Sequence, residues 1–365
     1  MSDSAKVLKE PLFQIEKRSN LPTWKAWTIR GGALLIGLVV SCILSALFLG
    51  GNPFAFFSAV FSGAFGTSTR MNTLLKETSL LLCVSLAIVP AFKMRFWNLG
   101  ANGQILVGCI ATTACMVYLN GKIPPVLLYV CMVVSAVLAG AIWAVIPAIF
   151  KAIWKTNESL FTLMMNYIAE GLVAFCLTLW ATDGSGTLPP IRDAMLPKIA
   201  GEDFIIPLIV AVLFAVGMFV YLRFTKQGYE ISVVGESENT ARYVGINVKK
   251  VVIRTLIVSG AICGLVGFLL SGAINGNIAK TMHDGMGFTA IMVAWLAKFN
   301  PVVMVIMSFA VIFVDRGAAF ASRQLGVTNS AFPSIVTGII FFFIIACEFF
   351  VEYKLKIRSK KGGAE

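Results

Sequence analysis

Three amide side chains interrupt a long apolar stretch in the run FWNLGANGQ, residues 96–104. Asn98, Asn102 and Gln104 lie there between two apolar segments, and the glycines beside them favour a break in the backbone. An amide that faces lipid without a partner is strongly unfavourable, so these side chains should face protein or a water-filled path. They can bind a neutral polar solute or fix helix packing, and both interpretations stay open.

A second polar group follows in the run NESLFTLMMNYIAE, residues 157–170. Asn157 precedes an apolar segment and Asn166 lies inside it, and we expect Glu158 and Glu170 near the two ends of that segment. Amide, aromatic and methionine side chains suit a neutral polar solute. Each of them is also typical of ordinary helix contacts, so any one alone favours packing.

Motifs for enzyme chemistry are missing from the sequence. It has no phosphate-binding loop, no HExxH run, no nucleophile elbow and a single histidine, His283. We expect His283 and Asp284 to form a surface contact or cap, and Asp315 and Arg316 to neutralise each other. None of these groups, nor Glu77, is expected to be the mid-span carboxylate that a proton-coupled carrier needs.

The elements that hold these side chains are predicted to be membrane helices. The chain of 365 residues is 58% hydrophobic and only 13% charged, whereas soluble domains are about 25% charged. We predict an all-α, polytopic integral membrane protein with about ten transmembrane helices between Gly31 and Phe350, the shorter ones tilted or broken. Gly260, Gly264 and Gly267 predict a close helix contact. The eight cysteines all lie in apolar runs without metal-binding spacing.

Charge distribution predicts the topology. The net charge of +12 is spread over loops instead of a groove-like patch, so nucleic acid is not expected as a partner. With both termini cytoplasmic, most of the 30 Lys and Arg residues fall on the inner side. We therefore expect a cytoplasmic N-terminal segment at 1–30, a transmembrane domain at 31–352 and a basic cytoplasmic tail at 353–365. Residues 182–203 form the largest outer loop, a candidate docking surface.

The cytoplasmic loop at 228–250 is expected to contain a short helix. Ser237 can cap its start, with Glu236 and Glu238 at the positive end of the helix dipole, and Gly245 suits the left-handed position that ends it. Ala241, Tyr243 and Val244 are expected to form a small apolar face beside Arg242. So short a helix is unstable alone, which predicts support from membrane helices and from a partner. An ordinary connector is an equally good interpretation.

Four ordered blocks of the sequence resemble a known family. RFWNLGANGQ, NESLFTLMMNYIA, VGESENTARYVGINVKKV and GFTAIMVAWLAKFNP are similar to segments of permeases of the branched-chain amino acid, ribose and nucleoside class of ABC importers. The resemblance extends from about Gly31 to Phe350. The run GGNPFAFFSAVFSGAFG, residues 50–66, resembles the longer of the two permeases in the nucleoside (basic membrane protein) branch. Asn102 stands where the family usually has glutamate.

The resemblance implies a transport subunit in the plasma membrane of a bacterium. Such a permease has an ABC importer fold of about ten helices and works with a second permease, an ABC ATPase and an extracytoplasmic substrate-binding lipoprotein. ATP and magnesium are bound by the partner ATPase, and no cofactor or metal is expected in this chain. By position, the ATPase-coupling residues are Gly235, Glu236, Ser237, Glu238, Asn239, Ala241, Arg242, Tyr243 and Gly245. The substrate-pathway candidates are Asn98, Asn102, Gln104, Asn157 and Asn166.

The expected function is ATP-driven import of nucleosides, with this chain forming the translocation path in the lipid bilayer. Ribose or another simple sugar is the alternative within the same class. A gradient-driven secondary carrier, and a membrane enzyme or scaffold without transport, are the alternatives outside it. The direction of transport follows from the resemblance, because hydropathy does not distinguish import from export.

Overall fold

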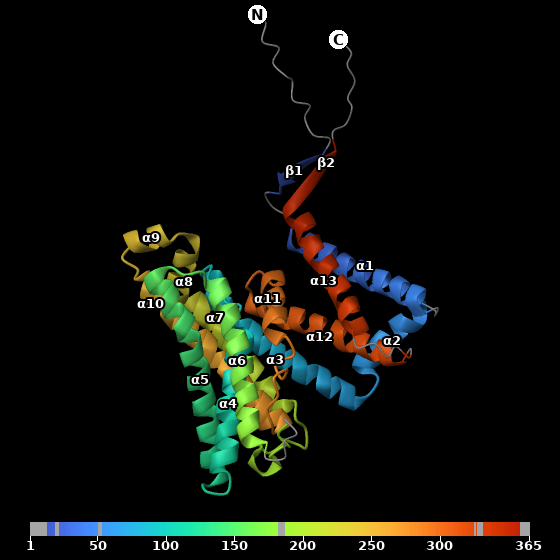
Figure 1. The fold of residues 1–365 in the computed structure, drawn as a ribbon. Coiled ribbons are helices and arrows are strands. Elements are labelled where there is room, and N and C mark those ends of the chain that lie inside the picture. Colours follow the sequence, from blue (N-terminus) through green and yellow to red (C-terminus); the bar gives the residue numbers. More distant parts are fainter. Residues whose placement is uncertain are drawn as a thin grey trace, which may run out of the picture. The chain divides into compact units, whose positions relative to one another are not determined.

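The structure is a computed structural model, and it describes residues 13–18, 22–49, 53–181, 187–324, 326 and 331–357. These residues are almost entirely helical (Figure 1). Eight of their helices are long and apolar enough to cross a membrane, and the three shorter apolar helices are Thr28–Leu44, Phe54–Phe65 and Met286–Leu296. The prediction of an all-α, polytopic membrane protein is confirmed. The chain divides into two compact units, residues 64–313 and residues 1–63 with 314–365.

The larger unit is built around α10 (Val248–Phe268). It packs against α3 (Ser68–Lys93), α4 (Ala101–Leu119) and α5 (Pro125–Trp154). A Cβ atom on Gly260 or Gly264 would collide with the backbone of Gly140 or Ala136 on α5, so the close contact predicted for these glycines is confirmed. A short π-helix, η2 (Leu269–Asn275), continues α10.

Less buried helices surround this centre. α6 (Glu158–Trp180) packs against α4, and α7 (Ile205–Phe224) packs against α3. Only 33% and 22% of their hydrophobic windows are buried, against 83% for α3, as expected for helices that face lipid. α11 (Met286–Leu296) is short and packs against α3 and α4, and α12 (Pro301–Gln324) follows it.

The polar loop at 228–250 contains more helix than predicted. α8 (Lys226–Glu236) directly follows α7, and α9 (Glu238–Tyr243) precedes α10. The loop at 187–203, which was predicted to face outward, has little regular structure: one short 3₁₀ helix, η1 (Arg192–Ala194), and an isolated bridge from Ile199 to Glu202. Its backbone is held at η2, because Leu196 N–H donates to Gly272 O at 3.0 Å. Residues 182–186 of this loop lie outside the described residues.

In the smaller unit, α1 (Thr23–Leu49) packs along α13 (Ala331–Glu352), as Figure 1 shows. The aromatic run that begins at Pro53 forms a helix, α2 (Pro53–Phe65). The described residues near the two ends of the chain add an element that was not predicted, an antiparallel pair of strands, β1 (Phe13–Lys17) and β2 (Tyr353–Ile357). Their pairing joins the two segments that the sequence analysis treated as separate cytoplasmic ends.

Candidate functional site

The amide cluster lies where the chain breaks between α3 and α4. Arg95 has a left-handed backbone with φ +59°, which reverses the chain after α3. Asn98, Asn102 and Gln104 follow within nine residues, and Asn166 reaches the same place from α6. All four side chains are at most 3% exposed. Buried amides require partners, so their hydrogen bonds identify what they hold.

Asn98 connects the break to α10. Its Oδ1 accepts hydrogen bonds from Gly100 N–H (3.1 Å) and from Gln104 Nε2 (3.3 Å), and its Nδ2 donates to Ser259 Oγ at 3.3 Å. Gln104 Oε1 is buried and has no hydrogen-bond partner among the described residues. Asn98 is therefore satisfied by protein groups, while Gln104 can still accept a hydrogen bond.

Asn166 and Asn102 satisfy the first backbone groups of two helices. Asn166 Oδ1 accepts from Gly103 N–H at 2.8 Å in the first turn of α4, and Asn166 Nδ2 donates to Leu99 O at 2.8 Å. Asn102 Oδ1 accepts from Gly287 N–H at 2.7 Å in the first turn of α11. Helix N-termini have free N–H groups that need such acceptors. At position 102 an amide oxygen does this without the negative charge that the family resemblance would place there.

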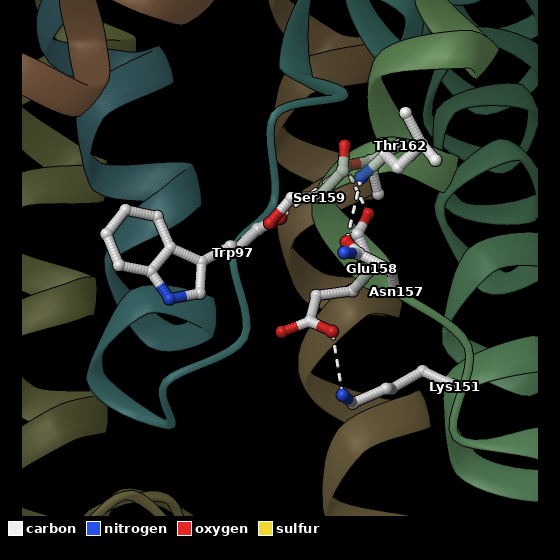
Figure 2. Close-up of polar contacts among 7 residues, drawn as sticks. Trp97, Lys151, Asn157, Glu158, Ser159 and Thr162 are labelled. Atoms are coloured by element: carbon white, nitrogen blue, oxygen red, sulfur yellow. Dashed lines mark hydrogen bonds and ion pairs between the residues drawn. The ribbon is translucent and has the colours of Figure 1, made fainter.

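Asn157 lies apart from the other four candidates. It is exposed and caps α6, since its Oδ1 accepts from Leu160 N–H at 3.1 Å. Figure 2 shows it beside Glu158, whose Oε2 is 2.7 Å from Lys151 Nζ, and near Thr162. Thr162 Oγ1 accepts from Leu99 N–H at 3.1 Å, which ties the break to the same end of α6. The structure thus gathers four of the five predicted pathway residues, and a pathway role for any of them stays a prediction.

Glu170 is not near a helix end, and that expectation was wrong. α6 continues from Glu158 to Trp180, so Glu158 starts the helix and Glu170 lies in its middle. The residues after Glu170 are apolar, which lets the helix continue through the membrane. Glu170 Oε1 is 3.7 Å from His283 Nε2, so His283 contacts a mid-helix carboxylate instead of making only a surface contact. The expectation of no mid-span carboxylate was therefore also wrong.

The predicted coupling helix is α9. Ser237 caps it, with Oγ accepting from Thr240 N–H at 3.2 Å, and Gly245 ends the turn with φ +83°. These two predictions are confirmed. The predicted apolar face is wrong: Ala241 is fully buried, whereas Tyr243 is 93% exposed and Val244 is 57% exposed. Ala241 therefore packs into the protein core, whereas the Tyr243 side chain extends away from it.

Buried side chains connect α9 to the amide cluster. Ala241 belongs to one hydrophobic cluster with Ile231 of α8, Val248 of α10, and Met94 and Phe96 of the broken segment. Asn98 follows Phe96 by two residues. Gly235 allows this packing, because a Cβ atom there would collide with the Lys93 carbonyl at the end of α3. The other predicted coupling residues, Glu236, Glu238, Asn239 and Arg242, are exposed.

A pocket of about 150 Å³ opens beside α9. Its apolar wall includes Met94, Phe96 and Val252, and its rim carries basic residues. Two of these are paired, Lys151 with Glu158 (2.7 Å) and Arg242 with Glu238 (3.3 Å). The other three basic residues have no acidic partner among the described residues; they are Arg95, Lys155 and Lys249. The pocket can therefore take an anionic group.

Comparison with known proteins identifies the family. The sequence pattern of the family described as "Branched-chain amino acid transport system / permease component" matches residues 70–345, which is most of the chain. The chain belongs to this family. The permease is similar to a glucose ABC transporter permease, TsgB13 of Haloferax volcanii, at 28% identity over 96% of this chain and 95% of the relative.

Nucleoside permeases are also among the relatives. The guanosine ABC transporter permease NupP of Bacillus subtilis is 27% identical over 90% of this chain and 96% of its own. The nucleoside ABC transporter permease NupB of Lactococcus lactis is 26% identical over 88% of this chain and 91% of its own. The recognition made from the sequence motifs is confirmed.

Family membership excludes two of the alternative functions, a membrane enzyme and a gradient-driven carrier. The permease is a transport subunit and not an enzyme, and it is a multi-pass protein of a cell membrane that belongs to an ABC system. A gradient-driven carrier is excluded by this membership, although the sequence argument used against it failed at Glu170. The coupling and pathway roles of individual residues remain predictions.

Proposed function

We propose that the permease forms the passage for neutral nucleosides in an ATP-driven importer. The observation that carries this proposal is the match over almost the whole chain to two relatives named for guanosine and nucleosides. The buried polar groups agree with a neutral solute, because amides and hydroxyls exchange hydrogen bonds without requiring a counter-ion.

The relatives' names also suggest which part of the solute is recognised. They include permeases for guanosine, for glucose and, as a probable assignment, for riboflavin. Each of these solutes carries hydroxyl groups on adjacent carbons, in a ribose, a glucose or a ribityl chain. A passage common to such relatives would bind those hydroxyls and leave the rest of the solute to other components.

Its partners in this proposal are a second permease, an ABC ATPase that binds ATP and magnesium, and a substrate-binding lipoprotein. The ATPase would contact the exposed side of α9, where Tyr243 is 93% exposed. Motion of α9 would reach the amide cluster through Ala241, Met94 and Phe96, which pack in one hydrophobic cluster. Acidic side chains of the ATPase would fit the basic pocket at Arg95 and Lys249.

The proposal includes an orientation. The side that carries α8, α9 and the basic pocket faces the cytoplasm, as the distribution of Lys and Arg favours. In this proposal both termini also face the cytoplasm, and the pairing of β1 with β2 supports only that they lie on the same side as each other. Residues 182–203 then face outward, where the binding lipoprotein would dock.

A sugar is the second candidate solute, and the relative named for glucose favours it, with 28% identity over 96% of this chain. The free sugar and the nucleoside share the hydroxyl groups, so the buried polar residues do not separate them.

The test is uptake into proteoliposomes. They contain this permease together with the second permease, the ATPase and the binding protein of its transport system. Labelled guanosine is the solute and unlabelled ribose the competitor. The proposal predicts ATP-dependent guanosine uptake that ribose does not suppress. Suppression by ribose would indicate that the transported solute is a sugar. Guanosine uptake that does not depend on ATP would contradict the proposal.

A further inference from the structure

Glu170 lies near the middle of α6, a helix long and apolar enough to cross a membrane. At 1.5 Å per residue it is about 18 Å along α6 from Glu158 and about 15 Å from Trp180. Trp180 Nε1 donates to Tyr118 Oη at 3.1 Å, and such aromatic pairs are typical of the membrane boundary. Lys151 and its partner Glu158 mark the other end of the helix. A hydrocarbon core of about 30 Å therefore has Glu170 close to its centre.

His283 lies beside the carboxylate of Glu170. The Nδ1 atom of His283 accepts a hydrogen bond from Gly285 N–H at 3.0 Å, so in the neutral ring the proton is on Nε2. Nε2 faces Glu170 Oε1 at 3.7 Å. The His283 side chain is only 14% exposed, whereas that of Glu170 is 39% exposed. One side of the carboxylate thus faces His283, and the rest is open.

The open side of Glu170 does not suit lipid. Ionisable groups at the bilayer centre are unfavourable and almost always face the protein interior or a water-filled cavity. On α6, Asn166, Ala169 and Val173 form the face that is buried in the protein, and Ile168 is 52% exposed on the opposite side. Glu170 lies at the edge of the buried face. This edge should therefore border water or the second permease.

A half-length helix begins beside the same pair. α11 has 11 residues, about 16 Å, and it starts at Met286 directly after the turn that carries His283. Its first turn donates to Asn102 through Gly287 N–H, and Met286 N–H donates to His283 O at 2.8 Å. Broken helices that begin near the midplane form substrate sites in other transporters, because their N-termini are positive.

We propose that Glu170, which lies beside His283, is a solute-binding residue on the translocation path. Its carboxylate accepts hydrogen bonds from two adjacent hydroxyl groups of the ribosyl part of the solute. A carboxylate has two oxygens and only accepts hydrogen bonds, which matches a pair of O–H donors, and such charge-assisted bonds are strong. This inference rests on the proposed function, because it takes the nucleoside as the solute.

The first test compares uptake of guanosine with that of 2′,3′-dideoxyguanosine, which lacks both hydroxyls. Wild type and Glu170→Gln are measured with the same binding protein, so any change in the ratio of kcat/KM values belongs to the permease. We expect Glu170→Gln to lower kcat/KM for guanosine about tenfold and to leave that for the dideoxy compound unchanged. Thr178→Val is the control, because this exposed residue of α6 bonds only to its own helix at Phe175 O. An unchanged ratio in Glu170→Gln would overturn the proposal.

The second test measures whether position 170 is accessible to water and needs no transport by the variant. Glu170→Cys and Ile168→Cys are exposed to a charged thiol reagent that does not cross lipid, with wild type as background for the native cysteines. We expect labelling of Glu170→Cys alone, and slower labelling when guanosine and the binding protein are present. Equal lack of labelling at both positions would place Glu170 away from water and contradict the proposal.

The two tests separate this inference from the function on which it rests. If the wild-type complex takes up neither guanosine nor ribose, the proposed function fails. If it takes up guanosine while Glu170→Gln keeps the wild-type ratio, only the role of Glu170 fails. If Glu170→Gln loses uptake of both guanosine and its dideoxy form equally, the hydroxyl assignment is wrong.

Discussion

Replacing Asn166 with leucine should destabilise the permease strongly. The side chain is 3% exposed and makes two hydrogen bonds of 2.8 Å, one from Gly103 N–H and one to Leu99 O. Leucine is similar in size but satisfies neither group. Each buried backbone group left without a partner costs about 1–3 kcal/mol, so the loss should total about 2–6 kcal/mol.

Gln104→Leu is the matched comparison within the same cluster. This substitution removes a single hydrogen bond, which Gln104 Nε2 donates to Asn98 Oδ1 at 3.3 Å. The Oε1 atom of Gln104 has no partner in the described part of the chain. The expected loss is below about 1.5 kcal/mol. Thr178→Val, which changes an exposed hydroxyl of α6, should alter stability by less than about 0.5 kcal/mol.

The assay is unfolding of the purified variants in detergent, by heating and by titration with a denaturing detergent. The order of stability should be Thr178→Val above Gln104→Leu, and both well above Asn166→Leu. If Asn166→Leu unfolds within about 0.5 kcal/mol of wild type, then Asn166 does not hold the broken segment. The interpretation of the amides as structural groups would then be refuted, and Asn166 would be available to bind the solute.

Three further predictions follow from single features. Lys155→Glu with Lys249→Glu should weaken retention of the ATPase during purification, most clearly at low salt; the same yield of complex would remove the basic pocket from the interface. Gly260→Val should prevent α10 from approaching α5 and abolish folded protein on size exclusion, and a folded variant would contradict the close contact. For Asp203, burial raises the pKa, but Lys76 (3.2 Å) and Lys198 lower it more, so the pKa lies below its ordinary value near 3.8. Since the folded state favours the ionised form, its contribution is present above about pH 4 and lost as pH falls below that. Lys76→Met should reduce this loss in an acid titration of stability, and an unchanged titration would disprove it.

Local features were predictable from the sequence because they depend on a few neighbouring residues. The cap at Ser237 and the left-handed Gly245 are of this kind, since a helix start and end need only the right side chain at the right position. The close helix contact at Gly260 and Gly264 was also predictable, because the spacing of the two glycines alone indicates it. The same holds for the apolar segments, whose length and composition indicate membrane helices.

Features that depend on distant segments were missed. The sequence shows that Ala241 and Tyr243 are apolar, but only the position of Met94 and Ile231 decides which of them is buried. β1 and β2 are about 340 residues apart in the chain, so neither strand indicates its partner. The partners of Asn102 and Asn166 lie on other helices, and the sequence therefore left packing and solute binding undecided. Glu170 could have been recognised, because apolar residues continue on both sides of it.

The central claim is that α9 couples ATP hydrolysis to a passage for nucleosides. It is tested most directly by ATP-driven guanosine uptake in proteoliposomes that contain the complete transport system with wild type or Tyr243→Glu. Tyr243 is 93% exposed, so the change should leave the permease folded. We predict that the variant still hydrolyses or binds ATP through its ATPase but loses most guanosine uptake. Uptake equal to that of wild type would contradict the claim.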